Sequence, residues 1–266
     1  MKIKFIGVGS AFTTPDCYQS NMLITASSGK KLLLDCGGDA RFALAECGIY
    51  GYNVGEIIDA VYISHLHADH IGGLEWLAFT TFFNPKHKRP TLFMEEKQMH
   101  KLWKHSLKGG LKYIEGKTMQ LTDYFDCRPQ PKDGTFLWEG IQATLVQMPH
   151  VVAGSSNHYS YGLLLREGTD PSIFITTDTQ FKPDLIADMA QKADVIFHDC
   201  ETTPFNTPVH VHYDELITLP ATLKQKMWLY HYQPQSKYNP EADGFQGFVV
   251  KGQEFDFSPL HDLISR

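Results

Sequence analysis

The stretch from Ser64 to Gly73, SHLHADHIGG, holds three histidines and one aspartate within six consecutive positions. It directly follows the apolar run DAVYI, which predicts that these side chains lie where a buried strand ends. Imidazole and carboxylate groups are ligands of zinc, manganese and iron. The spacing of His65 and His67 lets two imidazoles reach one ion, while Asp69 and His70 can face a second ion nearby.

Further metal-capable side chains follow other strand-like runs along the chain. Helical patterns over residues 39–48, 74–83 and 183–193 separate several of these runs, which favours an α/β domain. Open α/β sheets form their sites at the loops where strands end. The sequence therefore predicts one shared pocket. The residues at the ends of these runs are Asp35, His65, His150, Asp178, His198, Asp199 and His231.

The order of these motifs resembles the metallo-β-lactamase superfamily. HLHADH is followed by MPH at His150, TTDT at Asp178 and LYH at His231. This resemblance implies an αββα sandwich of two mixed sheets with helices on the outer faces, as a single domain over residues 1–266. It also implies a site for two divalent metal ions, with zinc expected and manganese as the alternative.

The resemblance assigns the ligands position by position. One ion is expected at His65, His67 and His150, the other at Asp69, His70 and His231, and Asp178 is expected to bridge them. The resemblance also implies that Asp69 is a catalytic residue as well as a ligand. Asp35 would orient a ligand histidine or stiffen the HLHADH loop.

Four further segments resemble the ribonuclease Z branch of the superfamily, of which the last three carry most of the likeness. The opening GVGSAFTTP is similar to the branch's GTGSA-x-P start, SYG at 160–162 to SYGY, and FHDCETT at 197–203 to HEATF. Downstream, His212 in HVHYDEL falls where the branch has an HST motif, although the residues that follow it differ. The resemblance implies that His212 gives a proton to the departing oxygen and that Asp199 orients it. His210 is expected to be structural or to line the pocket.

The chemistry implied by this branch is phosphodiester hydrolysis. Two metal ions can hold a bridging hydroxide that attacks phosphorus, and they can offset charge on the phosphoryl oxygens. Ser10 lies in the turn after the first strand, which lines the active site in this branch. Tyr159, Phe205 and Tyr232 are candidates for stacking a base, although packing is the commoner role of each.

The short segment between His150 and Asp178 bears on the substrate. Many tRNA-processing members of the branch insert a long glycine- and proline-rich arm there, and this segment leaves no room for one. The chain therefore resembles the cyclic-nucleotide phosphodiesterases of the branch, including the anti-Pycsar enzymes. That likeness implies 3′,5′-cyclic nucleotides as substrates and a homodimer whose pockets receive residues across the interface.

Three other functions remain open. The first is a ribonuclease Z-like tRNA 3′ processing endonuclease that lacks the arm or grips RNA with its lysines. The second is a non-catalytic sensor or scaffold that keeps the fold, and the third is thioester or lactam hydrolysis. The full set of ligands argues against the second, and His212 after FHDCETT argues against the third.

Charge and composition bear on the protein's binding partners and on its cellular location. A net charge of −6 argues against a protein dominated by phosphate-backbone binding. Residues 86–117 reverse this locally, and Lys97, Lys101, Lys104 and Lys108 recur at helical spacing. That stripe is either a solvated helix face or a surface that attracts an anionic substrate. The sequence has no long apolar run and only scattered cysteines, which predicts a soluble protein of the cytosol, or of the host cytosol if a phage encodes it.

Overall fold

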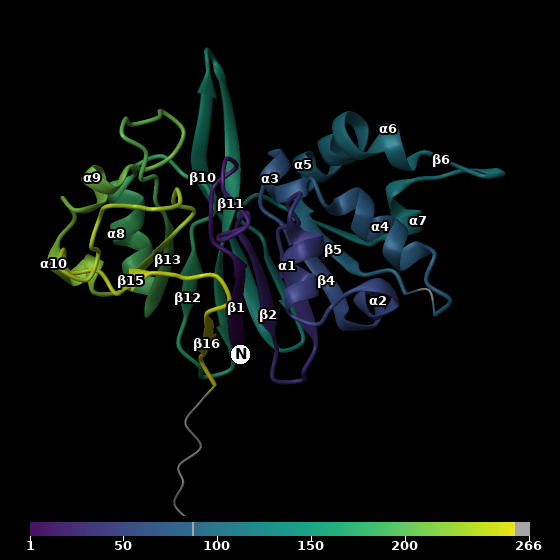
Figure 1. Ribbon diagram of the computed structural model, residues 1–266, viewed down its shortest axis with the longest axis horizontal. Coiled ribbons are helices and arrows are strands. Elements are labelled where there is room, and N and C mark those ends of the chain that lie inside the picture. The colour runs from purple at the N-terminus through teal and green to yellow at the C-terminus, as the bar shows by residue number, and fades with distance from the viewer. Residues whose placement is uncertain (87, 259–266) are drawn as a thin grey trace, which may run out of the picture.

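Two seven-stranded sheets dominate the computed structural model, which describes residues 1–86 and 88–258 (Figure 1). The first sheet has the order β16-β1-β2-β3-β4-β5-β8 and the second the order β15-β14-β13-β12-β11-β10-β9. Each mixes antiparallel pairs with parallel ones, such as β3 with β4 and β12 with β13. His87 and His261, which the sequence does not single out as metal ligands, lie outside the described residues.

The strands of the first sheet are β1 (Lys2–Gly7), β2 (Asn21–Thr25), β3 (Lys31–Leu34), β4 (Ile58–Ile63), β5 (Thr91–Glu95), β8 (Asp126–Gln130) and β16 (Glu254–Asp256). Those of the second are β9 (Thr135–Trp138), β10 (Ile141–Ala153), β11 (Ser156–Glu167), β12 (Ile173–Ile175), β13 (Val195–Asp199), β14 (Met227–Tyr230) and β15 (Gly247–Phe248). A small separate hairpin pairs β6 (Tyr113–Ile114) with β7 (Lys117–Thr118).

The helices on the side of the first sheet are α1 (Ala40–Glu46), α2 (Val54–Ile57), α3 (Ala68–Ile71), α4 (Leu74–Phe82), α5 (Glu96–Lys101), α6 (Lys108–Leu111) and α7 (Leu121–Tyr124). A 3-10 turn, η1 (Gly51–Asn53), precedes α2, and a π-helical segment, η2 (Leu102–Leu107), joins α5 to α6. Those on the side of the second sheet are α8 (Pro183–Lys192), α9 (Tyr213–Leu216) and α10 (Ala221–Lys224).

Three apolar clusters hold these layers together. The central cluster joins the sheets face to face, with the rings of Phe5 on β1 and Phe197 on β13 centred 4.8 Å apart. A second cluster packs α1 and α4 on the outer face of the first sheet. A third packs α8, through Ile186 and Met189, on the outer face of the second. Because strands such as β4 are buried on both faces, their sequences are almost continuously apolar. The expected αββα sandwich is confirmed.

The lysine stripe lies on the continuous helical segment formed by α5, η2 and α6. Lys97, Lys101, Lys104 and Lys108 are all exposed, while Met99 and Leu102 are buried. This segment therefore has a charged, exposed face and an apolar, buried face. Among the described residues, no helix is long and apolar enough to cross a lipid bilayer.

The segment after His150 extends the two strands that flank it. β10 and β11 continue through it as a hairpin that projects beyond the sheet (Figure 1), with Val151 opposite His158 and Ala153 opposite Ser156. The register shifts between Pro149 and Val151, so the pairing continues beyond the irregularity. The tip is exposed, which leaves backbone pairing as its main stabilisation.

Candidate metal centre

The seven predicted ligands come together at one end of the sandwich. His65 and His67 follow β4, Asp69 and His70 lie in α3, and His150 lies in β10. Asp178 and His231 follow β12 and β14 of the second sheet. Both sheets therefore contribute their strand ends to the same pocket, as open α/β sheets do.

Three overlapping groups of ligand atoms form within this pocket. In each group the candidate ligand atoms lie within 4.8 Å of one another, and Asp178 belongs to all three. Two of them hold the predicted ligands: His65, His67, His150 and Asp178, and Asp69, His70, Asp178 and His231. The third joins Asp178 and His231 to Asp199 and His210. Most of these side chains are buried, whereas His67 is exposed and leaves the pocket open on its side.

Buried polar atoms that lack a hydrogen bond test whether metal ions fit here. His65 Nε2, His70 Nε2 and Asp178 Oδ1 are buried and make no hydrogen bond, although His70 Nε2 lies 3.2 Å from Asp178 Oδ2 as an ion pair. Leaving buried polar atoms unsatisfied costs about 1–3 kcal/mol each, so their convergence calls for a partner. A divalent cation satisfies imidazole nitrogens and carboxylate oxygens together. The arrangement fits a metal site.

The first group is electrostatically suited to hold a cation. Burial holds the pKa of His65 well below its usual value and also lowers that of His67. The pKa of His150 is lowered to about 4, again chiefly by burial. These imidazoles are therefore neutral near pH 7, which is the form that binds a metal.

The second group carries the carboxylates. Burial alone would lower the pKa of His70 and of His231, but the nearby Asp178 carboxylate and its neighbours outweigh it and raise both pKa values. In turn, these histidines hold the pKa of Asp69 and of Asp178 below the usual range despite burial. The protonated histidines thus supply the positive charge that a cation would supply on binding.

Backbone strain occurs at the same pocket. Three non-glycine residues adopt left-handed backbone conformations there, with φ of 60° at Asp35, 55° at Thr177 and 67° at His231. Such conformations are unfavourable for residues with a Cβ and persist only where the surroundings enforce them. The surrounding packing therefore holds these residues in strained backbone conformations, which set the direction of their side chains.

Asp35 lies behind the ligands, where the resemblance placed it. Its Oδ2 accepts a hydrogen bond from His70 Nδ1 at 2.7 Å, and its carboxylate also accepts from the backbone N and Oγ of Ser64, both at 2.8 Å. Holding the proton on Nδ1 leaves His70 Nε2 free to bind a metal. His150 is held in the same way, because its Nδ1 donates to the carbonyl of Val209 at 2.8 Å.

Replacing Asp35 with asparagine should weaken metal binding by about 10- to 100-fold, because His70 loses the carboxylate that fixes its tautomer. Competition with a chromophoric chelator measures the affinity. Asp188→Asn is the matched control, since Asp188 only forms an exposed ion pair with Lys192. Equal metal affinity in Asp35→Asn and the control would contradict this role.

Gly37 lets the HLHADH loop approach closely. A Cβ built at Gly37 would lie 2.0 Å from the backbone oxygen of Asp69, whereas one at Gly38 would meet nothing closer than 3.5 Å. Gly37→Ala should therefore lower the free energy of unfolding by about 1–3 kcal/mol. Denaturant unfolding compares it with Gly38→Ala, which should be nearly neutral. Two equally stable variants would show that the approach is not tight.

The structure corrects the predicted pair of His212 and Asp199. His210, not His212, meets Asp199, with Nδ1 2.9 Å from Oδ2. His212 is buried elsewhere as the N-cap of α9: its Nδ1 accepts from the backbone N of Asp214, and its Nε2 donates to the carbonyl of Thr203 at 2.9 Å. His212 therefore has both nitrogens occupied in fold-stabilising bonds.

His210 borders the ligands directly. Its ring centre lies 4.8 Å from that of His231 and 5.1 Å from that of His150. Burial would lower the pKa of His210, but the adjacent Asp199 carboxylate raises it above the usual value. Despite burial, His210 holds the pKa of Asp199 down at about 2. His210 is thus the histidine positioned to carry a proton at this site.

One signal in the sequence could have identified His210. In an HST motif the histidine stands two residues before a threonine, and threonine is a favoured N-cap. His212 takes the N-cap position of α9, and His210 stands two residues before it. The spacing between a histidine and a following N-cap therefore points to His210 as well as to His212.

The predicted substrate-contacting residues lie around the pocket in different states. Ser10 is buried and its Oγ accepts from Gln233 Nε2 at 3.3 Å, while Phe205 is 65% exposed. Tyr232 packs on Phe248 and donates its hydroxyl to the carbonyl of Val249. Tyr159 is half-buried. Tyr232 is thus used in packing, and substrate contact remains a prediction for all four.

A model of the family described as "Anti-Pycsar protein Apyc1" matches residues 1–255 of the chain. The chain belongs to this family. The Apyc1 protein of Paenibacillus harenae is 35% identical over 234 residues, which cover 87% of this chain and 90% of that protein. That of Bacillus phage vB_BveM-Goe7 is 32% identical over 262 residues, which cover 95% and 97%. Apyc1 proteins thus occur in bacteria and in phages.

Solved structures agree on the fold of this Apyc1 family member. The metallo-β-lactamase fold protein YhfI from Bacillus subtilis superimposes with a TM-score of 0.74 at 18% identity, covering 96% of this chain and 98% of YhfI. At that identity the likeness shows the fold alone. The protein has an α/β metallo-β-lactamase fold with two mixed seven-stranded sheets and a buried cluster of histidines and aspartates suited to metal.

Proposed function

We propose that this protein hydrolyses 3′,5′-cyclic nucleotides to linear mononucleotides with the help of two divalent metal ions. The observation that carries the proposal is the joining of two ligand groups by Asp178 beside the pair of His210 and Asp199, in a chain of the Apyc1 family. Zinc is the favoured metal, with manganese as the alternative, because the ligands are imidazoles and carboxylates without a cysteine.

The chain's own residues divide the chemical work. When bound, two divalent ions supply a hydroxide nucleophile near neutral pH and offset the charge on the phosphoryl oxygens. One ion would be held by His65, His67 and His150, and the other by Asp69, His70 and His231. Asp178 would be a ligand of both. These ligands, fixed by Asp35 and the Val209 carbonyl, set where the phosphodiester is attacked.

His210 manages the proton in this proposal. Hydrolysis forms one P–O bond to a water oxygen and breaks the P–O bond to the ribose oxygen, which must gain a proton as it leaves. His210 keeps its Nδ1 proton, which points towards Asp199. The leaving ribose oxygen receives the proton on the other ring nitrogen, Nε2. Afterwards, His210 is reprotonated from solvent. Asp199 also lies 3.3 Å from His231 Nδ1, so one carboxylate orients both histidines.

A substrate panel tests the proposal. Protein supplied with zinc or manganese is incubated with cyclic purine mononucleotides, cyclic pyrimidine mononucleotides, cyclic dinucleotides and a precursor tRNA. We expect ring opening of a cyclic mononucleotide and no specific tRNA cleavage. Strong, salt-sensitive cleavage of the tRNA beside intact cyclic nucleotides would instead support the ribonuclease Z-like endonuclease. Rapid thioester cleavage without phosphodiester cleavage would also overturn the proposal.

We also propose that the protein works as a homodimer. Large apolar side chains are exposed at Phe12, Val152 and Phe205, with 92%, 57% and 65% of their surface accessible. They belong to the loop after β1, the projecting hairpin and the loop after β13, which lie towards the same end of the sandwich (Figure 1). A second copy would bury them. Light scattering measures the molar mass, and a monomer at micromolar concentration would refute the dimer.

A further inference from the structure

The loop between β13 and α9 decides where His210 stands. Residues 200–212 contain no helix or strand, and Phe205 at their middle is exposed. A proton donor must lie within hydrogen-bonding reach of the leaving oxygen, and a displacement of about 1 Å can cost about 100-fold in rate. What fixes this loop therefore matters for the proposed reaction.

We infer that Gln180 and Gln233 are positioning residues that hold this loop from its two ends and thereby place His210. The inference rests on the proposed function, because it assigns the glutamines to the residue that would donate the proton. Neither glutamine is among the candidate metal ligands, and neither carries a charge.

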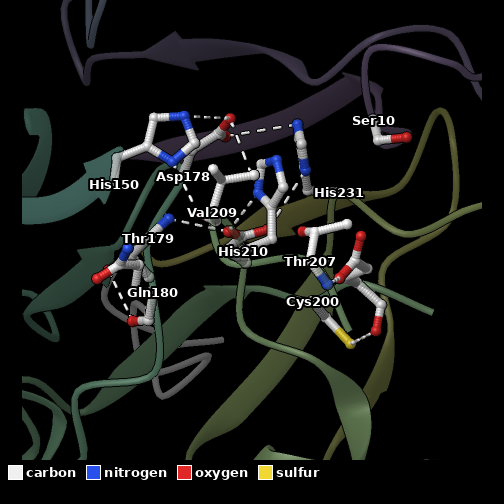
Figure 2. Close-up of polar contacts among 12 residues, drawn as sticks. Ser10, His150, Asp178, Thr179, Gln180, Cys200, Thr207, Val209, His210 and His231 are labelled. Carbon is white, nitrogen blue, oxygen red and sulfur yellow. Dashed lines mark hydrogen bonds and ion pairs between the residues drawn. The ribbon is translucent and has the colours of Figure 1, made fainter. Parts of the chain in front are cut away.

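Gln180 holds the end of the loop that leads into His210. Its side-chain Nε2 donates to the carbonyl of Pro208 at 2.7 Å, and its backbone N donates to the carbonyl of Pro149 at 2.8 Å. Gln180 thus connects the loop to the strand that carries His150. The next carbonyl, that of Val209, accepts from His150 itself (Figure 2).

Gln233 holds the start of the loop. Its side-chain Oε1 accepts from the backbone N of Thr202 at 2.6 Å, and its backbone N donates to Thr202 Oγ1 at 3.1 Å. Its Nε2 donates to Ser10 Oγ at 3.3 Å. Gln233 thus ties the start of the loop to the turn after β1 and to the segment that carries His231.

The loop has its own internal bonds, which separate positioning from folding. Glu201 accepts from the backbone N of Thr207 at 2.8 Å and donates its own backbone N to the carbonyl of Val211 at 2.8 Å. These bonds preserve the shape of the loop when a glutamine is removed. Loss of a glutamine should therefore shift the loop relative to the ligands without unfolding the protein.

The experiment compares Gln180→Ala and Gln233→Ala with the parent. Gln130→Ala is the matched control, because Gln130 Nε2 also donates to a carbonyl, that of Arg128, but on the edge strand β8. On a cyclic nucleotide, kcat should fall about 10- to 100-fold in each loop variant, with KM and metal content nearly unchanged. Hydrogen exchange over residues 200–212 should accelerate in both variants and not in the control.

The leaving group distinguishes positioning of His210 from general damage. An aryl phosphodiester with an activated leaving group needs little proton donation, so its hydrolysis should fall much less than that of the cyclic nucleotide. Equal losses on both substrates, or unchanged hydrogen exchange in the loop, would overturn the inference. If the parent leaves cyclic nucleotides intact, the proposed function fails, and the exchange measurement still tests the two glutamines.

Two conservative variants guard against simple loss of packing. Gln180→Met keeps the length of the side chain but cannot donate to Pro208, and should behave like Gln180→Ala. Gln233→Glu keeps an oxygen for the backbone N of Thr202 and should retain most of the parent's kcat. Full activity in Gln180→Met, or none in Gln233→Glu, would contradict the proposed contacts.

Discussion

Asp178→Ala should lose both metal ions. Its kcat/KM on a cyclic nucleotide should fall at least about 1,000-fold, because bound ions provide several kcal/mol of transition-state stabilisation. Asp178 is the only residue shared by the two ligand groups formed around His65 and His70, so its removal opens both at once. Elemental analysis and steady-state kinetics measure the two effects, and thermal unfolding shows whether the variant still folds.

Asp188→Ala is the control for this variant, because it removes an exposed carboxylate paired with Lys192. It should keep its metal and its rate. A folded Asp178→Ala protein that retains two ions and the parent's kcat/KM would show that the reaction does not depend on the shared carboxylate.

His210→Ala should lower kcat on a cyclic nucleotide by about 10²- to 10⁴-fold, the usual contribution of a positioned general acid. Metal content should remain, because the two groups built on His65 and His70 are complete without His210, which shares only a third group with Asp178, Asp199 and His231. His212→Ala separates the two histidines. It removes the N-cap of α9 and should cost about 0.5–2 kcal/mol of stability, while the folded protein keeps most of its turnover.

Kinetics and metal analysis decide which of the two histidines is the proton donor. Both variants are measured at a temperature at which each is folded. The reverse result, with His212→Ala inactive at full metal content and His210→Ala fully active, would restore the assignment made from sequence. It would also separate Asp199 from the proton donor, since Asp199 contacts His210.

The gathering of the candidate ligands could be predicted because their chemistry and their position in the fold coincide. His65, His150, Asp178 and His231 follow apolar runs, and such runs become buried strands whose ends meet in one pocket. The helices expected over residues 39–48, 74–83 and 183–193 appear as α1, α4 and α8. In these segments the structure favoured by the local sequence pattern is the same as the one favoured by tertiary packing.

Other features depend on contacts that the sequence does not reveal. Which of His210 and His212 meets Asp199 is decided by where α9 begins, and a short helix gives a weak start signal. The hairpin after His150 follows from pairing across an irregular register rather than from a strand-like pattern. Gln180 and Gln233 belong to no motif, because their role arises only from which carbonyl or amide lies opposite them.

The most direct test of the central claim is the metal content of the parent protein after incubation with zinc or manganese and removal of free ions. We expect two ions per chain, held by the groups that share Asp178. Folded protein that retains no ion under either condition would contradict it.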